Sequence, residues 1–342
     1  MKKALSMVLA VLMLFAASAC AVSTTEPVST EETTVTEQAT EPAAAPVSAD
    51  GQDSSLAGKK IGNTICYKGD EWCADLTQKM ESYGADYGVI TTVEDGDLNV
   101  ETQNKQIENM IANKVDAIFI DPNTPTGINE ALKKAQDAGI PVFAYDGFLE
   151  GFDAVTTITW DQPLTGELMA NYVIDYVNKN LNGEAKVVML TLSASPQCVS
   201  RADRFIEVCA EKAPGINIFN TQDSEGNREK AANAITNIVE PFDLVVSVVD
   251  NGAWGAISAI EARGLTNVKV FSMGAFGAEP FDALKAMHPN YQACIVIAPE
   301  EVAKLLYEAA ERYFSGETVE KLSNIPIYVA DSTNVEQFWN FD

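Results

Sequence analysis

The segment from Val115 to Phe148, VDAIFIDPNTPTGINEALKKAQDAGIPVFAYDGF, determines which fold the chain adopts. It starts with a short apolar run that ends at Ile120, as expected for a strand buried on both faces. Apolar residues then recur at helical spacing within Ile128–Ala138, and Gly139 supplies a left-handed helix C-cap. Pro141 opens a second apolar strand. Two parallel strands joined by a helix need a right-handed crossover, so the segment predicts one βαβ unit of a parallel sheet.

Each of these two strands ends in an aspartate, Asp121 after the first and Asp146 after the second. In open parallel sheets, ligands bind outside the carboxyl ends of the strands. Two carboxylates at one edge of the sheet therefore indicate a binding site, and Gly147 is expected to leave the backbone free to present the second one. The alternative, that both aspartates only cap turns, is left open by this unit alone.

The composition limits the range of partners. The chain has 342 residues, of which 46% are hydrophobic, and a net charge of −26. This length predicts two domains, each large enough for its own core. The acidity argues against nucleic acid and anionic membrane surfaces as partners, because both attract Lys and Arg.

The N-terminus has the pattern of a secretory signal. Two lysines precede an apolar core from Ala4 to Phe15, which is too short to span a membrane stably. The small residues Ala17–Ala19 that run into Cys20 resemble the bacterial lipobox. This resemblance implies that residues 1–19 are a lipoprotein signal peptide and that Cys20 becomes the lipidated N-terminus. An ordinary signal with a chance cysteine is the alternative.

Residues 20–57 are expected to form a lipid-anchored, disordered tether. From residue 21 onwards the segment is rich in Thr, Ser, Glu, Ala and Pro, and it has no aromatic residue, Lys or Arg. Such a segment cannot bury enough apolar surface to fold, and its charges keep it extended. The fold is therefore expected to begin near Gly58.

Beyond Cys20, an odd number of cysteines remains, so a complete disulfide framework within one chain is impossible; they are Cys66, Cys73, Cys198, Cys209 and Cys294. Cys66 and Cys73 could meet across the first strand–helix loop, but buried thiols are the default interpretation. The chain has no C-x-x-C motif and no His–Cys cluster, so neither a metal nor a cofactor is expected.

From Gly58 the chain alternates strand and helix at intervals of roughly 25 residues, which predicts an α/β fold with parallel sheets covered by helices on both faces. The alternation restarts after Asp161 as a second, similar lobe. The sequence contains no glycine-rich phosphate loop and no G-x-S-x-G motif. The expected strands are 60–67, 87–92, 115–120, 140–145, 155–160, 186–192, 216–220, 243–249, 268–273, 292–297 and 325–329.

Several short motifs follow one another in a characteristic order; they are Asp121-Pro122, Ile140-Pro141-Val142 before Asp146, Asp161–Gly166, and Asp250 followed by Gly255-Ala256. In this order and spacing, residues 58–342 resemble the ribose-binding protein group of type I periplasmic solute-binding proteins. The resemblance implies two doubly wound parallel-sheet lobes joined by a three-crossing hinge. It assigns 58–160 and 298–326 to the N-lobe, and 161–297 and 327–342 to the C-lobe, with crossings near 160–161, 297–298 and 326–327.

The same resemblance implies a set of ligand-binding residues, namely Asp70, Trp72, Asp121 and Asp146 on the N-lobe and Arg201 on the C-lobe, to which we add Asp250 as a predicted ligand-binding residue. Such a set suits a sugar, because carboxylates accept from hydroxyls, Arg donates from a rigid fork, and an indole packs against a C–H face. Two alternatives to a ligand role remain open. Trp72 could be a core residue at the start of a helix, and Arg201 could be a solvated charge on a helix. Trp254 is interpreted as core.

Four positions depart from the ribose-binding pattern. Val249 replaces a ligand-binding Asn, and Gly274 replaces a ligand-binding Asp. Ile297 replaces the Gln of the hinge, and Gly147 replaces a residue that is often Arg. Replacements could come from nearby polar residues, namely Ser195, Gln197, Asp250 and Asn251. This pattern suits a ligand with an apolar edge, such as a deoxy sugar or a furanosyl signalling molecule, at least as well as ribose.

The sequence therefore predicts a lipid-anchored solute-binding protein that delivers a monosaccharide or similar small polyol to the permease of an ABC importer. We expect a monomer at the outer face of the bacterial cytoplasmic membrane, with no nucleic-acid partner. A surface receptor for a furanosyl signalling molecule or another non-ribose ligand, feeding chemosensing, is the main alternative. A carbohydrate-acting enzyme is disfavoured because the only histidine, His288, lies between a helix and a strand. Sugar-responsive transcription regulators share such a domain, but they carry a helix-turn-helix where this chain has its signal.

Overall fold

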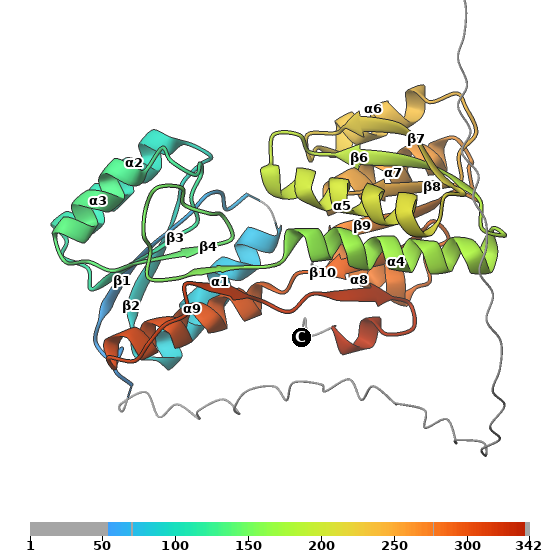
Figure 1. Ribbon diagram of the computed structural model, residues 1–342. Helices are drawn as coiled ribbons and strands as arrows, with labels where there is room; N and C mark the ends of the chain where they lie inside the picture. Colours follow the sequence, from blue (N-terminus) through green and yellow to red (C-terminus); the bar gives the residue numbers. More distant parts are fainter. Residues whose placement is uncertain (1–53, 70, 276, 339–342) are drawn as a thin grey trace, which may run out of the picture. The chain divides into compact units, whose positions relative to one another are not determined.

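The computed structural model describes residues 54–69, 71–275 and 277–338. The signal, Cys20, most of the expected tether and Asp70 lie outside these residues. Within them, strands and helices alternate and form two sheets, which confirms the expected α/β class (Figure 1).

The first sheet, here called the N-lobe sheet, contains six strands in the order β11-β5-β4-β3-β1-β2, and all neighbouring strands are parallel. The first strand therefore lies between the second and the third, the arrangement that creates a topological switch point. The strands are β1 (Lys60–Ile65), β2 (Ile90–Asp95), β3 (Ala117–Ile120), β4 (Val142–Tyr145), β5 (Thr157–Thr159) and β11 (Leu322–Asn324).

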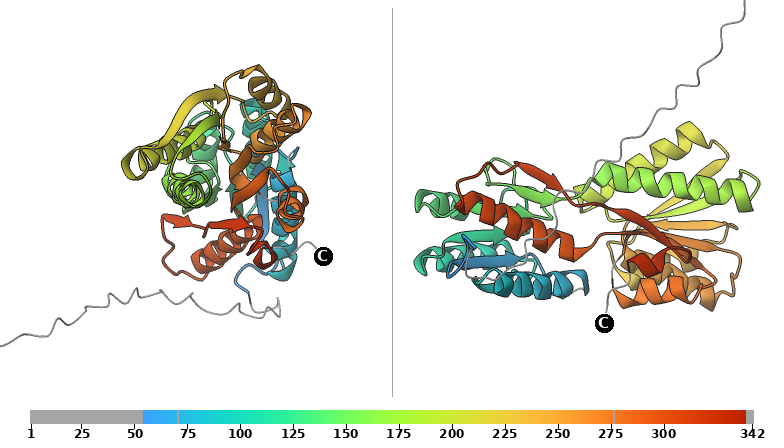
Figure 2. Two further views of the ribbon diagram at one scale, coloured as in Figure 1. Left: turned by 90° about the vertical axis from the view of Figure 1, so that its right-hand side faces the viewer. Right: turned by 90° about the horizontal axis from the view of Figure 1, so that it is seen from below.

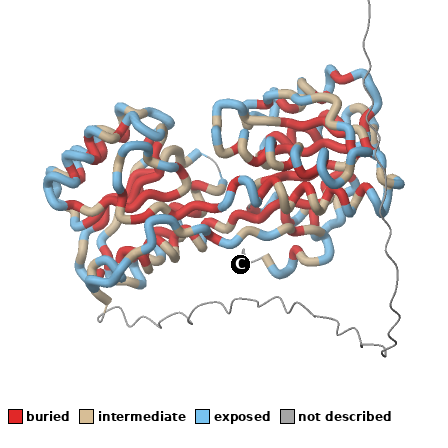
Figure 3. Tube along the Cα trace, in the orientation of Figure 1, coloured by how far each residue is buried: buried red, intermediate tan, exposed pale blue. Residues whose placement is uncertain are grey.

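Helices cover both faces of this sheet (Figures 1 and 2). Helices α1 (Glu71–Asp86) and α9 (Pro299–Phe314) pack together on one face, and α2 (Val100–Ala112) and α3 (Asn129–Asp137) on the other. Strand β3 explains the arrangement, because Phe119 joins the cluster of α1 and α9 while its two neighbours, Ile118 and Ile120, join that of α2 and α3. Both faces are buried, as the apolar run predicts (Figure 3).

The second sheet, here called the C-lobe sheet, also contains six strands, in the order β12-β10-β9-β8-β6-β7. Strand β12 is antiparallel to β10, and the other neighbours are parallel. Its strands are β6 (Ala185–Thr191), β7 (Ile216–Asp223), β8 (Leu244–Ser247), β9 (Lys269–Ala275), β10 (Tyr291–Val296) and β12 (Tyr328–Asp331). Its helices are α4 (Gln162–Asn180), α5 (Pro196–Lys212), α6 (Arg228–Asn237), α7 (Asp250–Ala262) and α8 (Ala278–Lys285), and the short 3-10 helix η1 (Val335–Gln337) follows β12.

Two motif glycines allow helices of the C-lobe to pack closely. A Cβ added at Gly166 of α4 would lie 2.2 Å from the carbonyl oxygen of Arg201 on α5. A Cβ added at Gly255 of α7 would lie 2.2 Å from the carbonyl oxygen of Arg228 on α6. Because both obstacles are backbone atoms, no larger residue fits at either position without moving a helix.

In the described residues the chain passes from one sheet to the other three times. The first passage runs from β5 through Trp160 and Asp161 into α4. The second runs from β10 through Ile297 and Ala298 into α9, and the third from β11 to β12. The expected three-crossing hinge is thereby confirmed, and the lobe boundaries derived from the sequence are kept as a proposal.

The beginning of the fold differs from expectation. Leu56 is fully buried, and the hydroxyl of Ser55 donates to the carbonyl oxygen of Glu311 at 2.9 Å. Residues 54–57 are therefore part of the N-lobe, not of an extended tether, and the fold begins at least four residues before Gly58. The buried side chain of Leu56 supplies apolar surface, of which a segment rich in Thr, Ser and Glu has little.

Other differences are local. The expected strand 325–329 spans a crossing instead, with β11 ending at Asn324 and β12 starting at Tyr328. Cys66 and Cys73 are thiols, so the possible disulfide between them is not present. In the part of the chain that the structure describes, no helix has both the length and the apolar composition needed to cross a membrane.

Candidate functional site

The N-lobe side of the candidate site lies at the switch point of its sheet. Asp121 follows β3 and is only 2% exposed, and its Oδ2 accepts a hydrogen bond of 3.1 Å from the backbone N–H of Cys66, which follows β1. Strands β1 and β3 are neighbours, so this carboxylate lies where the strand order reverses. Its hydrogen bond also holds the loop after β1, so Asp121 has a structural role in addition to any ligand contact.

Asp146 follows β4 and has a left-handed backbone, with φ of 56°. Its N–H donates to the carbonyl oxygen of Ile158, and its own carbonyl oxygen accepts from the hydroxyl of Thr159. The expectation that Gly147 supplies the backbone freedom was wrong, because Asp146 itself adopts the unusual conformation. Glycine is needed at 147 for a different reason, since an added Cβ would lie 2.9 Å from Cγ of Pro122.

The C-lobe side is formed by Arg201 on α5, which is 5% exposed. Its Nε donates to Oε1 of Gln162 at 2.6 Å, and its Nη1 donates to the carbonyl oxygens of Val248 and Met273 at 3.1 and 3.3 Å. These contacts exclude the alternative of a solvated helix charge. Burial lowers the pKa of the guanidinium, and electrostatic interactions with Cys198 and with Asp146 of the N-lobe oppose this shift.

The departures at positions 274 and 297 lie next to this arginine. A Cβ added at Gly274 would lie 3.0 Å from Nη1 of Arg201 and 3.4 Å from Cδ1 of Ile297. The space that a side chain at 274 would fill is therefore taken by the guanidinium of Arg201 on one side and by the side chain of Ile297 on the other. An acidic side chain at this position would for that reason displace Arg201.

Two tryptophans connect the lobes at the first crossing. The rings of Trp72 and Trp160 lie 5.8 Å apart at an angle of 59°, and Cζ of Arg201 lies 5.7 Å from the centre of the Trp160 ring. Nε1 of Trp72 donates to the carbonyl oxygen of Ile297 at 2.9 Å. Trp72 is half-buried against the core, so both of the predicted roles, core residue and ligand platform, remain compatible with its position.

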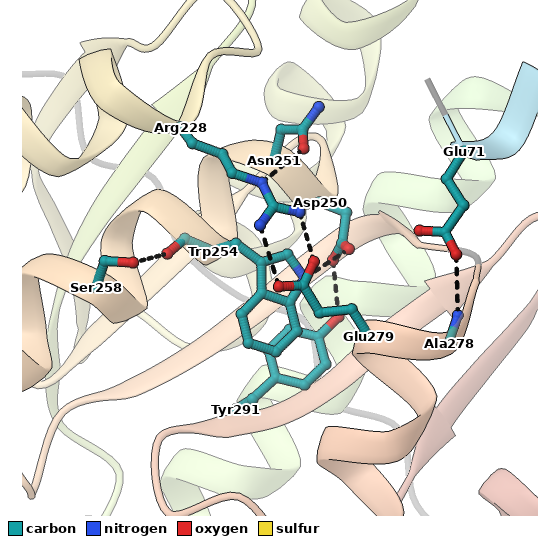
Figure 4. Close-up of polar contacts among 9 residues, drawn as sticks. All are labelled: Glu71, Arg228, Asp250, Asn251, Trp254, Ser258, Ala278, Glu279 and Tyr291. Carbon is teal, nitrogen blue, oxygen red and sulfur yellow. Dashed lines mark hydrogen bonds and ion pairs between the residues drawn. The ribbon is translucent and has the colours of Figure 1, made fainter. Parts of the chain in front are cut away.

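Asp250, at the start of α7, lies in a different environment (Figure 4). Its Oδ2 accepts from Nε1 of Trp254 at 2.8 Å, and its Oδ1 accepts from the hydroxyl of Tyr291 at 2.9 Å. The two rings are stacked with centres 5.0 Å apart. Burial raises the pKa of Asp250 to about 7, although hydrogen bonds from Tyr291 and Trp254 oppose the shift. Trp254 is buried, which confirms its interpretation as core.

The contacts of Asp250 turn its carboxylate towards the C-lobe core, so its predicted ligand role stays a prediction without geometric support. The three other suggested replacements also have local partners. Ser195 caps α5 and donates to Oε1 of Gln197 at 3.1 Å. Oδ1 of Asn251 accepts from Nε of Arg228, which also pairs with Glu279 (Figure 4).

One further contact joins the lobes at the start of α1. Oε1 of Glu71 accepts from the backbone N–H of Ala278, the first residue of α8, at 3.2 Å (Figure 4). A Cβ added at the preceding Gly277, where φ is 101°, would lie 2.4 Å from Cδ of Glu71. The sequence analysis did not identify Glu71, because only the fold brings α1 to the N-terminus of α8.

Trp72 and Arg201 thus both lie against the ring of Trp160. Asp146 acts electrostatically on Arg201, and Asp121 and Asp146 follow neighbouring strands. Asp250 belongs to a separate cluster, and Asp70 lies outside the described residues. The structure adds two residues that the sequence analysis did not name as ligand candidates. Nε1 of Trp160 and Nε2 of Gln162 are buried and have no hydrogen-bond partner among the described residues. A sequence signal existed for Gln162, since it belongs to the Asp161–Gly166 motif.

Comparisons with known proteins identify the family of the chain. Residues 61–318 match the family model of the periplasmic binding protein domain. The chain is 30% identical to the galactofuranose-binding protein YtfQ of Escherichia coli (strain K12) over 280 residues, which cover 78% of this chain and 86% of the relative. It is 24% identical to the ribose import binding protein RbsB of Bacillus subtilis (strain 168) over 269 residues, with coverage of 78% and 85%.

Solved structures give the same result. A crystal structure of a galactofuranose binding protein aligns with a TM-score of 0.71 and 26% identity, covering 82% of this chain and 96% of the other. A D-allose-bound solute binding protein from Actinobacillus succinogenes 130z aligns with a TM-score of 0.75, covering 82% and 99%. At 23% identity, the second likeness concerns the fold alone.

Proposed function

The chain belongs to the family of type I periplasmic sugar-binding proteins of ABC importers, and we propose that it binds a monosaccharide or similar small polyol between its lobes and delivers it to a transporter. The observation that carries this proposal is the buried Arg201 on the C-lobe, whose pKa the carboxylate of Asp146 on the N-lobe raises against the effect of burial. Asp121 adds a second carboxylate beside the first. Carboxylates accept hydrogen bonds from sugar hydroxyls, and a guanidinium donates hydrogen bonds to sugar oxygens, so this combination suits a polyol.

The ligand itself is proposed to be a furanosyl sugar rather than ribose in the usual ribose-binding pose. Gly274 and Ile297 bring no polar side chain to the site, whereas the family pattern has an Asp and a Gln there. Relatives described as galactofuranose-binding proteins support this choice. The alternative role is that of a surface receptor that signals ligand occupancy to a chemosensing protein. Both roles use the same binding site and differ only in the partner protein.

The anchor at Cys20 is also a proposal, supported by the small residues before it and the unusual composition behind it. Cys20→Ala should release the protein from the membrane fraction and leave ligand binding unchanged. Membrane association that persists in this variant would contradict lipidation. Family membership places the protein outside the cytoplasm in either case.

Ligand binding can be tested on the mature protein with a panel of D-ribose, D-galactose, L-arabinose, D-allose and myo-inositol. A true ligand at 100 times its Kd adds about 2.7 kcal/mol to the free energy of unfolding, which raises the melting temperature by several degrees. Bound ligand should also reduce the radius of gyration in small-angle scattering, because bridging favours the closed state. A protein that responds to no member of the panel in either measurement would contradict the proposal.

A further inference from the structure

Two buried hydrogen-bond donors at the first crossing have no acceptor among the described residues. They are the indole N–H of Trp160 and the side-chain amide nitrogen of Gln162, in residues that are 5% and 6% exposed. Burying a donor without a partner costs free energy, so native proteins rarely retain such groups unless another molecule supplies the acceptor. Here two occur within three residues of sequence, at the passage from β5 to α4.

The orientation of the Gln162 amide is fixed by its neighbour. Nε of Arg201 can only donate, so the atom 2.6 Å away must be the amide oxygen, and the other end of the amide must be the donor. The backbone holds this arrangement, because Oδ1 of Asp161 caps α4 by accepting from the N–H of Leu164 at 2.8 Å. The backbone and the amide oxygen of Gln162 are therefore both held in place, and only its Nε2 is available to a ligand.

Arg201 contributes to the same environment. Its Nε and Nη1 are used within the protein, and none of the hydrogen bonds recorded for the described residues uses its Nη2. Its guanidinium lies over the ring of Trp160. Around this arginine the crossing therefore presents N–H groups, while the carboxylates Asp121 and Asp146 belong to the opposite lobe.

We propose that Trp160 Nε1 and Gln162 Nε2 form, beside Arg201, a donor-only subsite that receives an acceptor oxygen of the bound sugar. The assignment rests on the proposed function and specifies its ligand further. Ring ether oxygens accept hydrogen bonds but cannot donate them, so a cyclic sugar suits this subsite better than a cyclitol, which has only hydroxyl groups. The Asp-rich N-lobe side then selects the hydroxyl groups of the same molecule.

The first test is Trp160→Phe, which keeps an aromatic side chain but removes the N–H together with the five-membered ring of the indole. For the sugar of the panel that the wild-type protein binds most tightly, calorimetry should show about tenfold weaker binding. The melting temperature of the empty protein should fall, because the smaller ring leaves a cavity at a buried position. Trp254→Phe is the matched control, since that N–H already donates to Asp250. It should lower the melting temperature and change the affinity less than twofold.

The second test is Gln162→Glu, which keeps an oxygen for Arg201 and converts the donor into an acceptor. Two acceptors then face each other, so the affinity for the same sugar should fall by more than tenfold. A wild-type protein that binds a sugar of the panel, together with variants that bind it equally well, would overturn the subsite while leaving the proposed function intact. Unchanged affinity of Trp160→Phe also overturns it, because the loss of melting temperature alone reports the smaller ring. No binding of any panel sugar by the wild type would contradict the proposed function itself.

Discussion

Asp146 on the N-lobe and Asp250 on the C-lobe both lie just beyond a parallel strand, yet their surroundings differ. Asp146 raises the pKa of Arg201 of the other lobe through its charge and has a left-handed backbone. Asp250 accepts hydrogen bonds from Trp254 and Tyr291 of its own lobe. The position after a strand therefore brings a carboxylate to the edge of the sheet, but the neighbouring side chains decide whether it is held within its own lobe.

The two sides of the candidate site also differ in hydrogen-bonding character. The N-lobe side contributes the acceptors Asp121 and Asp146, and the C-lobe side, with the first crossing, contributes the donors Arg201, Gln162 and Trp160. A polyol needs both, because each hydroxyl donates one proton and accepts through its oxygen. The asymmetry predicts which half of a ligand each lobe selects.

The largest expected effect concerns pH and Asp250. Its folded-state pKa of about 7 lies above the ordinary value of 3.8, so the folded protein keeps the proton while the unfolded chain loses it. The contribution is complete below pH 3.8 and is lost as the pH rises through about 7. At about 1.4 kcal/mol per pKa unit, the free energy of unfolding should fall by at most about 4 kcal/mol over this range.

Urea unfolding of the wild type and of Asp250→Asn at several pH values measures this contribution, because other acidic groups cancel in the difference. The wild type should lose stability relative to the variant between pH 4 and pH 7, and the difference should be constant above pH 8. Parallel curves would show that the Asp250 carboxyl is not held protonated by its surroundings.

The next effect is on affinity and concerns Asp146→Asn. Asparagine tolerates a positive φ, so the backbone at 146 is retained and only the charge is lost. A hydrogen bond to a charged group contributes about 1.5–3 kcal/mol, so binding of the best panel sugar should weaken by about ten- to a hundredfold. Asp250→Asn should change the same affinity less than threefold. A variant at 146 that melts early but binds normally would show that Asp146 caps a turn.

The sequence was sufficient to predict the fold class, the three crossings and the family, because these depend on periodicity and on short motifs in order. It also named Asp121, Asp146 and Arg201 as ligand-binding residues, which stays a prediction. It could not predict that Asp250 turns inwards, since this requires Tyr291, which is distant in sequence and adjacent only through the sheet. The sequence also did not reveal the two donors at 160 and 162, because packing in the folded chain decides whether a buried N–H finds an acceptor.

A smaller effect is expected for the contact between the lobes at Glu71. Its carboxylate accepts from the first N–H of α8, where the helix dipole favours negative charge. Glu71→Gln keeps the acceptor but removes the charge, so the affinity for the best panel sugar should fall by about two- to fivefold at low salt. At high salt the two proteins should bind alike, because Glu71 is exposed. A loss that does not depend on salt would contradict an electrostatic contact.

The smallest effect is expected for Gly274→Ala, which tests whether the missing side chain on the C-lobe side positions Arg201. The added methyl would lie 3.0 Å from Nη1, so the guanidinium must move by a few tenths of an ångström. Because such a shift weakens hydrogen bonds without breaking them, binding should weaken by about two- to threefold, with little change in melting temperature. Adding Ile297→Val removes Cδ1, the other near neighbour at 3.4 Å, and gives the methyl room to move away from the arginine. The double variant should therefore recover part of the affinity. If it binds no better than Gly274→Ala, the loss does not come from displacement of Arg201, and the glycine has another role on the C-lobe side.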